Sequence, residues 1–234
     1  VRGDRAIAVG QMGVVLVRET GGNWTEVESG TEERLLGVDI NPDGIALAVG
    51  AFGTLLRSTD GGRSWTPSAP RWAGTFKDTA GRLGDFFEPS LYAVQLADDA
   101  RAWVVGELGL VLRSEDGGQT WQVGHAGESG VDGVEPTLFG LSMRADGVGF
   151  AVGQKGYILK TEDDGVSWVA LERPTHANLL DVTASADGTV LATGMRDMLL
   201  SRDHGRSWTR VQGADIATGW YSGAAQPGGD AAPL

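Results

Sequence analysis

The chain has 234 residues, enough for one all-β domain or two smaller ones. Its formal net charge of −12 argues against a surface that binds nucleic-acid phosphates or anionic lipid, so neither is expected as a partner. No apolar run approaches the roughly 20 residues of a membrane helix, and the lack of cysteine excludes disulfides and thiolate chemistry.

An octet recurs along the chain: Ser or Thr, any residue, Asp, a polar residue or Gly, Gly, any residue, Ser or Thr, Trp. Complete copies cover residues 58–65, 114–121, 161–168 and 201–208, and a shorter copy without the Asp covers 18–24. Five copies at intervals of tens of residues indicate a repeat architecture.

The octet has the residues of a hairpin turn. We predict that its Asp accepts backbone N–H groups just after it, that its Gly adopts a left-handed conformation, and that its Ser or Thr begins the next strand. The Trp would cover the end of the unit. Calcium binding is not favoured, because Gly fills the alternate ligand positions. The structural residues are therefore Asp60, Trp65, Asp116, Trp121, Asp163, Trp168, Asp203 and Trp208.

Each octet follows two apolar runs separated by a glycine-bounded turn. We predict a strand, a two-residue turn and a strand within residues 7–17, 47–56, 103–112, 150–159 and 191–200. A short strand follows each octet, as at 25–28 and 169–172. A further strand precedes four of the hairpins, at 35–40, 91–96, 138–143 and 179–184.

The first unit lacks this preceding strand, because the sequence begins almost at Ile7. A candidate fifth copy stands at 220–225 and would complete the first sheet, leaving no open edge. We therefore predict an all-β fold, a five-bladed β-propeller of four-stranded antiparallel blades, closed by the C-terminal strand joining the N-terminal blade. It forms a single domain over 1–229, followed by a disordered tail at 230–234.

In the preceding strands, small and polar residues alternate with apolar ones. Period-two alternation would turn the polar set toward a narrow central channel and the apolar set toward neighbouring blades. The predicted channel-lining residues are Asp39, Gln95, Ser142, Asp181 and Thr183.

Two insertions lengthen the repeat, at 66–89 and at 124–136, the second acidic with Glu128, Asp132 and Glu135. Both would lie on the face that carries the Gly-x-x-Gly turns, where loops on a rigid scaffold concentrate function. We predict a partner-binding surface there of Met12, Phe52, Trp72, Phe76, Phe86, Phe87 and Leu108. The alternative is that the four aromatic residues merely anchor the first insertion.

The octets resemble the Asp-box, or bacterial neuraminidase repeat. The longer unit, Ala-Val-Gly-x-x-Gly, an apolar run and Arg-Ser-x-Asp-Gly-Gly-x-x-Trp, resembles the photosystem II stability and assembly factor family and its non-photosynthetic relatives. That resemblance covers nearly the whole chain. It implies a propeller that binds membrane-protein partners during assembly, outside the cytoplasm and without catalysis. The best-known members look seven-bladed and use a basic patch, whereas this chain supplies five blades and is acidic.

The main hypothesis is thus a non-enzymatic protein-binding scaffold that assists a membrane protein complex without inserting into the membrane. A glycoside hydrolase is the alternative, with Asp39, Asp181 and Glu107 as candidate carboxylates. Arg34, Arg144 and Arg196 share no repeat position and form no evident sialidase-type clamp. A lectin ranks third.

No cofactor or metal is expected, since His125, His176 and His204 fall in different connections without ligand spacing. We expect a periplasmic or otherwise exported location. Because the sequence begins at Val1, we expect that an upstream segment has been removed.

Overall fold

The computed structural model describes residues 5–19, 21–72, 87–126, 135–213 and 215–225. Its regular structure there is β-strand and three short 3-10 turns, η1 (Gln11–Gly13), η2 (Glu107–Gly109) and η3 (Gln154–Gly156). No helix in these ranges has the length and apolar character needed to cross a membrane. The chain divides into two compact units, Val1–Leu138 and Phe139–Leu234.

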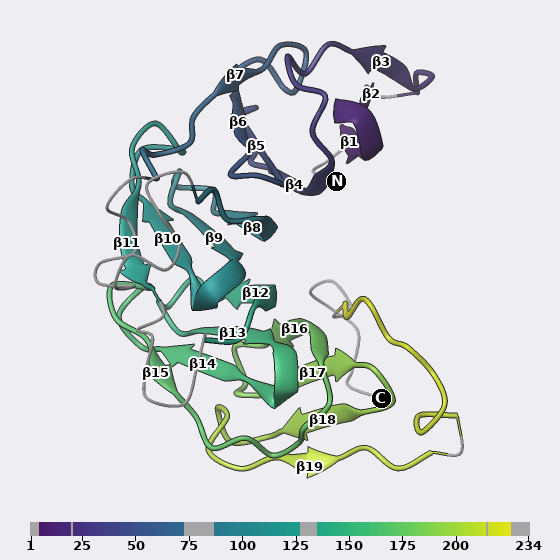
Figure 1. Ribbon diagram of the computed structural model, residues 1–234, viewed down its shortest axis with the longest axis vertical. Coiled ribbons are helices and arrows are strands. Elements are labelled where there is room, and N and C mark those ends of the chain that lie inside the picture. Colours follow the sequence, from purple (N-terminus) through teal and green to yellow (C-terminus); the bar gives the residue numbers. More distant parts are fainter. Residues whose placement is uncertain (1–4, 20, 73–86, 127–134, 214, 226–234) are drawn as a thin grey trace. The chain divides into compact units, whose positions relative to one another are not determined.

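Unit 1 contains three antiparallel sheets whose strands follow chain order (Figure 1). The first sheet has three strands, β1 (Ala6–Val9), β2 (Val15–Arg18) and β3 (Thr25–Val27). The second has four, β4 (Leu35–Ile40), β5 (Ala46–Gly50), β6 (Leu55–Ser58) and β7 (Thr66–Pro67). The third has β8 (Leu91–Leu96), β9 (Ala102–Gly106), β10 (Val111–Ser114) and β11 (Gln122–His125).

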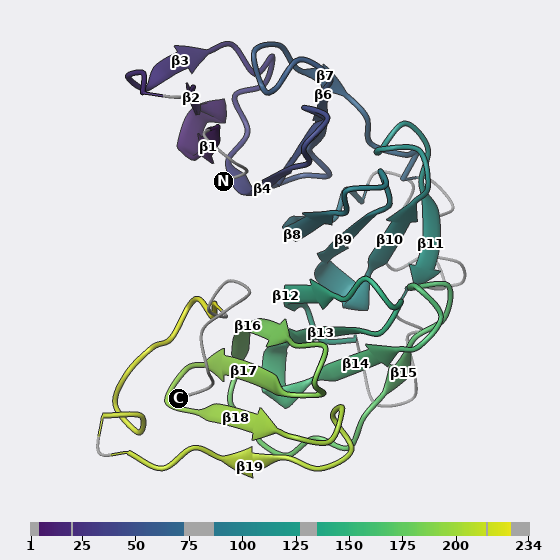
Figure 2. The same cartoon turned by 180° about the vertical axis from the view of Figure 1, so that it is seen from behind.

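Unit 2 contains two four-stranded sheets of the same design, seen from behind in Figure 2. One has β12 (Leu138–Met143), β13 (Gly149–Gly153), β14 (Ile158–Thr161) and β15 (Val169–Ala170). The other has β16 (Leu179–Ala184), β17 (Val190–Gly194), β18 (Met198–Ser201) and β19 (Thr209–Arg210).

Within each unit, apolar residues from consecutive sheets form a shared core. Val15 and Val17 of the first sheet pack with Leu35 and Leu56 of the second. Similar clusters join the second sheet to the third, and in unit 2 join the β12–β15 sheet to the β16–β19 sheet. Fully burying one such side chain contributes about 1.5–3 kcal/mol, so contact between successive sheets stabilises each unit.

Two local predictions were wrong and a third needs a refinement. The Gly-x-x-Gly turns are longer than two residues: five residues separate β1 from β2, and four separate β9 from β10. The first turn contains η1, in which Val14 N donates to Gln11 O, and Gly10 N donates to Val14 O across the turn. The Ser or Thr of the octet stays in the turn, and the next strand starts after the Trp, as β7 does at Thr66. The alternation is interrupted only at the second residue of β4, β8 and β16, where a register shift occurs, and pairing is regular from the third residue on.

The C-terminal segment also differs from its prediction. Trp220 forms an isolated antiparallel bridge with Met195, and residues 221–225 form no strand. The predicted tail at 230–234 lies outside the described residues. A single domain and a closed ring stay predictions.

Candidate functional site

Every complete octet folds into the same hydrogen-bonded turn. Asp60 Oδ1 accepts the backbone amides of Arg63 at 2.9 Å and Ser64 at 3.0 Å, while Asp60 Oδ2 accepts the Ser64 hydroxyl at 2.6 Å. Ser58 Oγ donates to Asp60 and accepts the Gly62 amide at 2.9 Å. Asp116, Asp163 and Asp203 sit in equivalent networks. Both carboxylate oxygens are thus engaged in holding the turn.

These bonds favour the ionised carboxylate. For Asp60, slight burial acts to raise the pKa, but the hydroxyls of Ser64 and Ser58 and the following amides outweigh it and lower the pKa to about 2. For Asp203 the Ser207 hydroxyl is the largest cause of a pKa lowered to about 2. The octets therefore stabilise the fold rather than offer a free catalytic acid.

The octet tryptophans differ in how their indole N–H is satisfied. Trp65 donates to Gly62 O at 2.9 Å and Trp168 to Gly165 O at 3.2 Å. The Nε1 atoms of Trp121 and Trp208 are buried without a hydrogen-bond partner among the described residues.

The predicted channel-lining residues are half-buried on the first strands of their sheets. Three of them accept a backbone amide from the next segment: Asp39 from Leu96 at 2.8 Å, Ser142 from Ala184 at 3.0 Å, and Asp181 from Ala224 at 2.7 Å. Gln95 and Thr183 occupy the fifth position of β8 and β16. Asp39 and Ser142 therefore link neighbouring first strands, and Asp181 links β16 to the C-terminal segment.

The apexes of the Gly-x-x-Gly turns carry side chains in a left-handed backbone conformation. The φ angles are 55° at Met12, 49° at Phe52, 58° at Leu108 and 55° at Lys155. Such a conformation is uncommon for bulky residues. Backbone bonds hold the turns, since Gly13 N donates to Glu33 O and Gly53 N to Pro89 O.

Met12 and Phe52 are strongly exposed at these apexes, at 72% and 66% of their surface, whereas Leu108 is half-buried. Lys155 is an apex residue that the sequence analysis did not select. The fifth turn is one residue shorter, and Arg196 at φ 59° takes the place of Gly13 there. Lys155 could have been found from the repeat, because it occupies the same position as Met12 and Phe52. The prediction missed it because it considered only apolar residues at that position.

Trp72 does not belong to the exposed surface. It is only 9% exposed and packs in the core cluster with Val49, Leu91 and Leu110. Gly53 lets this ring approach, because a Cβ there would lie 2.3 Å from Trp72 Nε1. Trp72 therefore packs in the core instead of on the predicted partner-binding surface, so the prediction for this residue was wrong. Phe87 is half-buried, and Phe76, Phe86, Glu128 and Asp132 lie outside the described residues.

The candidate hydrolase carboxylates are each engaged by backbone amides. Asp39 also accepts Ile40 N, Asp181 accepts Val182 N, and Glu107 accepts Ser90 N at 2.9 Å. Burial raises the pKa of Asp181, while the Ala224 and Val182 amides oppose that rise. In the described ranges no three His, Asp or Glu side chains group together as metal ligands would.

Sheets of three or four short antiparallel strands, each with an octet turn before its last strand and packed on one another within each unit, are typical of β-propeller repeat proteins. A family model described as photosynthesis system II assembly factor YCF48 matches residues 16–122 and 83–176, more than half of the chain. The chain therefore belongs to this family, and the resemblance seen in its repeats is confirmed.

Solved structures agree with that class. YCF48 from Cyanidioschyzon merolae is 26% identical with a TM-score of 0.57, over 80% of this chain and 59% of that one. The chain thus spans less than two thirds of that relative. A YCF48 bound to D1 peptide is 16% identical with a TM-score of 0.53, over 92% of this chain and 79% of that one.

A GH74 xyloglucanase from Xanthomonas campestris shares the fold alone, at 16% identity and a TM-score of 0.64 over 90% of this chain and 36% of that one. Among curated protein sequences, none matches significantly.

Proposed function

We propose that the protein is a non-enzymatic scaffold that binds a segment of a membrane-protein partner outside the cytoplasm and assists the assembly of a membrane complex. The observation that carries this proposal is the exposure of Met12 and Phe52 at the apexes of successive turns in unit 1. Burying a Met or Phe side chain contributes about 1.5–3 kcal/mol, so two such anchors suit a peptide ligand. Membership of the YCF48 family and the D1 peptide bound to a structural relative support it.

The scaffold of this proposal is a closed five-bladed propeller. Tyr221 N donates to Gly194 O and Arg196 N to Gly219 O, which reproduces the bonds of Leu35 N to Gly10 O and Gly13 N to Glu33 O. By this analogy, the strand of the next sheet would begin at Tyr221, one residue later than the sequence alignment suggested. In this register the segment would supply the strand that β1 lacks.

Site-specific photo-crosslinking tests the binding proposal. A benzophenone amino acid in place of Phe52, in cells that contain the natural partners, should give an adduct whose mass-spectrometric map falls in one membrane protein. The same probe at Val169, which is 65% exposed on β15, is the matched control. Met12→Ser should weaken the Phe52 adduct without lowering stability.

Equal adducts at both positions, or an adduct unchanged by Met12→Ser, would contradict the proposed surface. Export is tested separately, by fusing alkaline phosphatase, which is active only in an oxidising compartment, to the full-length protein.

One observation favours the hydrolase as second candidate: burial raises the pKa of Asp181, as a general acid requires. Turnover of aryl glycosides that disappears in Asp181→Asn would establish it, and absence of turnover by the unaltered protein would remove it.

A further inference from the structure

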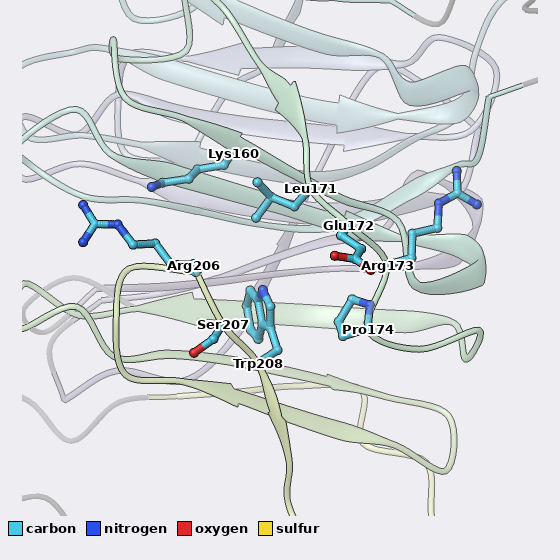
Figure 3. A pocket seen from close by; sticks show the side chains of 9 residues that line it. Lys160, Leu171, Glu172, Arg173, Pro174, Arg206, Ser207 and Trp208 are labelled. Atoms are coloured by element: carbon cyan, nitrogen blue, oxygen red, sulfur yellow. The ribbon is translucent and has the colours of Figure 1, made fainter.

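Unit 2 contains a groove of about 560 Å³ between the segment after β15 and the octet turn that precedes β19 (Figure 3). Leu171, Pro174 and Trp208 supply its apolar lining, and Lys160 and Arg206 supply cations. Neither the family assignment nor the apex surface of unit 1 accounts for this groove.

The apolar lining rests on the core of unit 2. Leu171 and Trp208 pack against the buried cluster that includes Phe150. The Trp208 and Phe150 rings meet edge to face, with centroids 6.4 Å apart and planes at 89°. Gly205 permits this closeness, because a Cβ there would lie 2.5 Å from the Phe150 ring. The floor is therefore a fixed surface rather than a set of mobile side chains.

Two of the three cations in this groove, Lys160 and Arg206, act on the carboxylate of Glu162. Lys160 Nζ lies 2.6 Å from Glu162 Oε1, and the positive charge of Arg206 also acts on Glu162. The Arg206 guanidinium forms no hydrogen bond or ion pair with any described residue. Arg173 lies over the Tyr157 ring at 5.1 Å, and Glu172 also lines the groove. Three cations against two carboxylates leave one excess positive charge.

Unit 1 has a groove at the same repeat positions, and the two grooves differ in how their charges are paired. It has a volume of about 490 Å³ and is lined by Val17, Glu19, Val27 and Arg63. These residues correspond to Lys160, Glu162, Leu171 and Arg206. In unit 1 Arg63 forms an ion pair with Glu19, so the charges balance. In unit 2 the lysine that replaces Val17 pairs with the glutamate and leaves the arginine available.

We propose that the groove of unit 2 binds a carboxylate attached to an apolar body. The carboxylate meets Arg206 beside Lys160, and the body lies on Leu171, Pro174 and Trp208. A single excess charge suits a monoanion better than a phosphate dianion, and a guanidinium holds a carboxylate by charge-assisted hydrogen bonds. The ligand is a free organic acid or the C-terminal residue of a peptide. This inference does not depend on the proposed function.

Phenylacetate is the probe, and the indole N–H resonance of Trp208, assigned with Trp208→Phe, is the readout. Phenylacetate should shift that resonance saturably, and phenylacetamide should not. Arg206→Gln should weaken binding at least tenfold. Lys160→Val should do the same, because it restores the unit 1 arrangement in which the glutamate neutralises the arginine. Glu162→Gln should strengthen binding, and Arg63→Gln in the balanced groove should leave it unchanged.

Binding of phenylacetamide equal to that of phenylacetate, or binding unaffected by both Arg206→Gln and Lys160→Val, would overturn the proposal. A peptide that ends in a free phenylalanine carboxylate, compared with its amidated form, distinguishes the two sources. Tighter binding of the free-carboxylate peptide than of phenylacetate assigns a peptide terminus, and the reverse assigns a free acid.

Discussion

Among single residues, the octet aspartates have the most definite physical role. Each accepts hydrogen bonds from two or more groups that lie two to four residues away, and each bond is stronger to the ionised carboxylate. The repeated Asp-Gly-Trp spacing made this geometry accessible from the sequence, because every partner is local. Trp72 was misread for the opposite reason. Its ring packs beside Gly53 in a core formed by residues that are distant in the sequence. The local sequence pattern around Trp72 therefore could not predict its burial.

The lowered aspartate pKa values give a pH-dependent stability. The pKa of Asp60 falls from 3.8 to about 2 on folding, so its contribution is complete above pH 4 and is lost as the pH drops through 2. We expect the free energy of unfolding, from urea titrations, to fall between pH 4 and pH 2. Asp60→Ala should cost about 1–2 kcal/mol at pH 7 after allowance for solvent screening and should show a weaker fall. Parallel pH profiles of the two proteins would contradict this account.

At the scale of strands, side chains link first strands that belong to successive sheets. Asp39 reaches from β4 to the Leu96 amide of β8, and Ser142 performs the same task from β12 to the Ala184 amide of β16. The bounds of β4, β8, β12 and β16 followed from the repeat to the residue. Their interrupted register did not, because a register shift depends on what pairs with the strand and not only on its own residues.

Substitutions at Asp39 test whether its hydrogen bond with the Leu96 amide stabilises the protein, or whether any residue is tolerated there. Asp39→Ala should destabilise unit 1 by about 1–2 kcal/mol, because the backbone amide of the buried residue Leu96 loses its acceptor. Asp39→Ser places there the hydroxyl that serves in β12 and should recover most of the loss. Urea unfolding measures both variants. Equal destabilisation by serine and alanine would show that the amide bond is not the cause.

For the whole molecule, ring closure is the outstanding expectation. The sequence suggested it from a count of strands, while the backbone bonds of Tyr221 and Arg196 revise its register by one residue. If the segment joins β1 as β4 joins β5, Ala224 stands opposite Ala8, by analogy with Val38 opposite Ala48. The sequence alignment would instead place Gly223 opposite Ala8. The number of strands could not decide between these registers. Residues 223–225 are glycine and alanine, so they show no alternation of polar and apolar side chains that would fix the register.

Because the natural chain has no cysteine, introduced disulfides can test closure directly. We expect Ala8→Cys with Ala224→Cys to form an intramolecular disulfide on mild oxidation, since opposite residues of antiparallel strands lie within bonding range. Ala8→Cys with Gly223→Cys should form it less completely. Ala8→Cys with Ala217→Cys is the control. Non-reducing electrophoresis and the shift in Tm report the outcome, and no bond in the first pair would argue against closure in this register.

The backbone clamps of the Gly-x-x-Gly turns also bear on how the protein can diversify. Since Gly13 and Gly53 bind main-chain oxygens of Glu33 and Pro89, the turn conformation does not depend on the identity of the intervening apex residue. Methionine, phenylalanine, leucine and lysine already occupy that place within one chain. Binding specificity can therefore change in evolution through the apex residues without a change in the backbone of the turns. It could also be engineered by randomising positions 12, 52, 108 and 155.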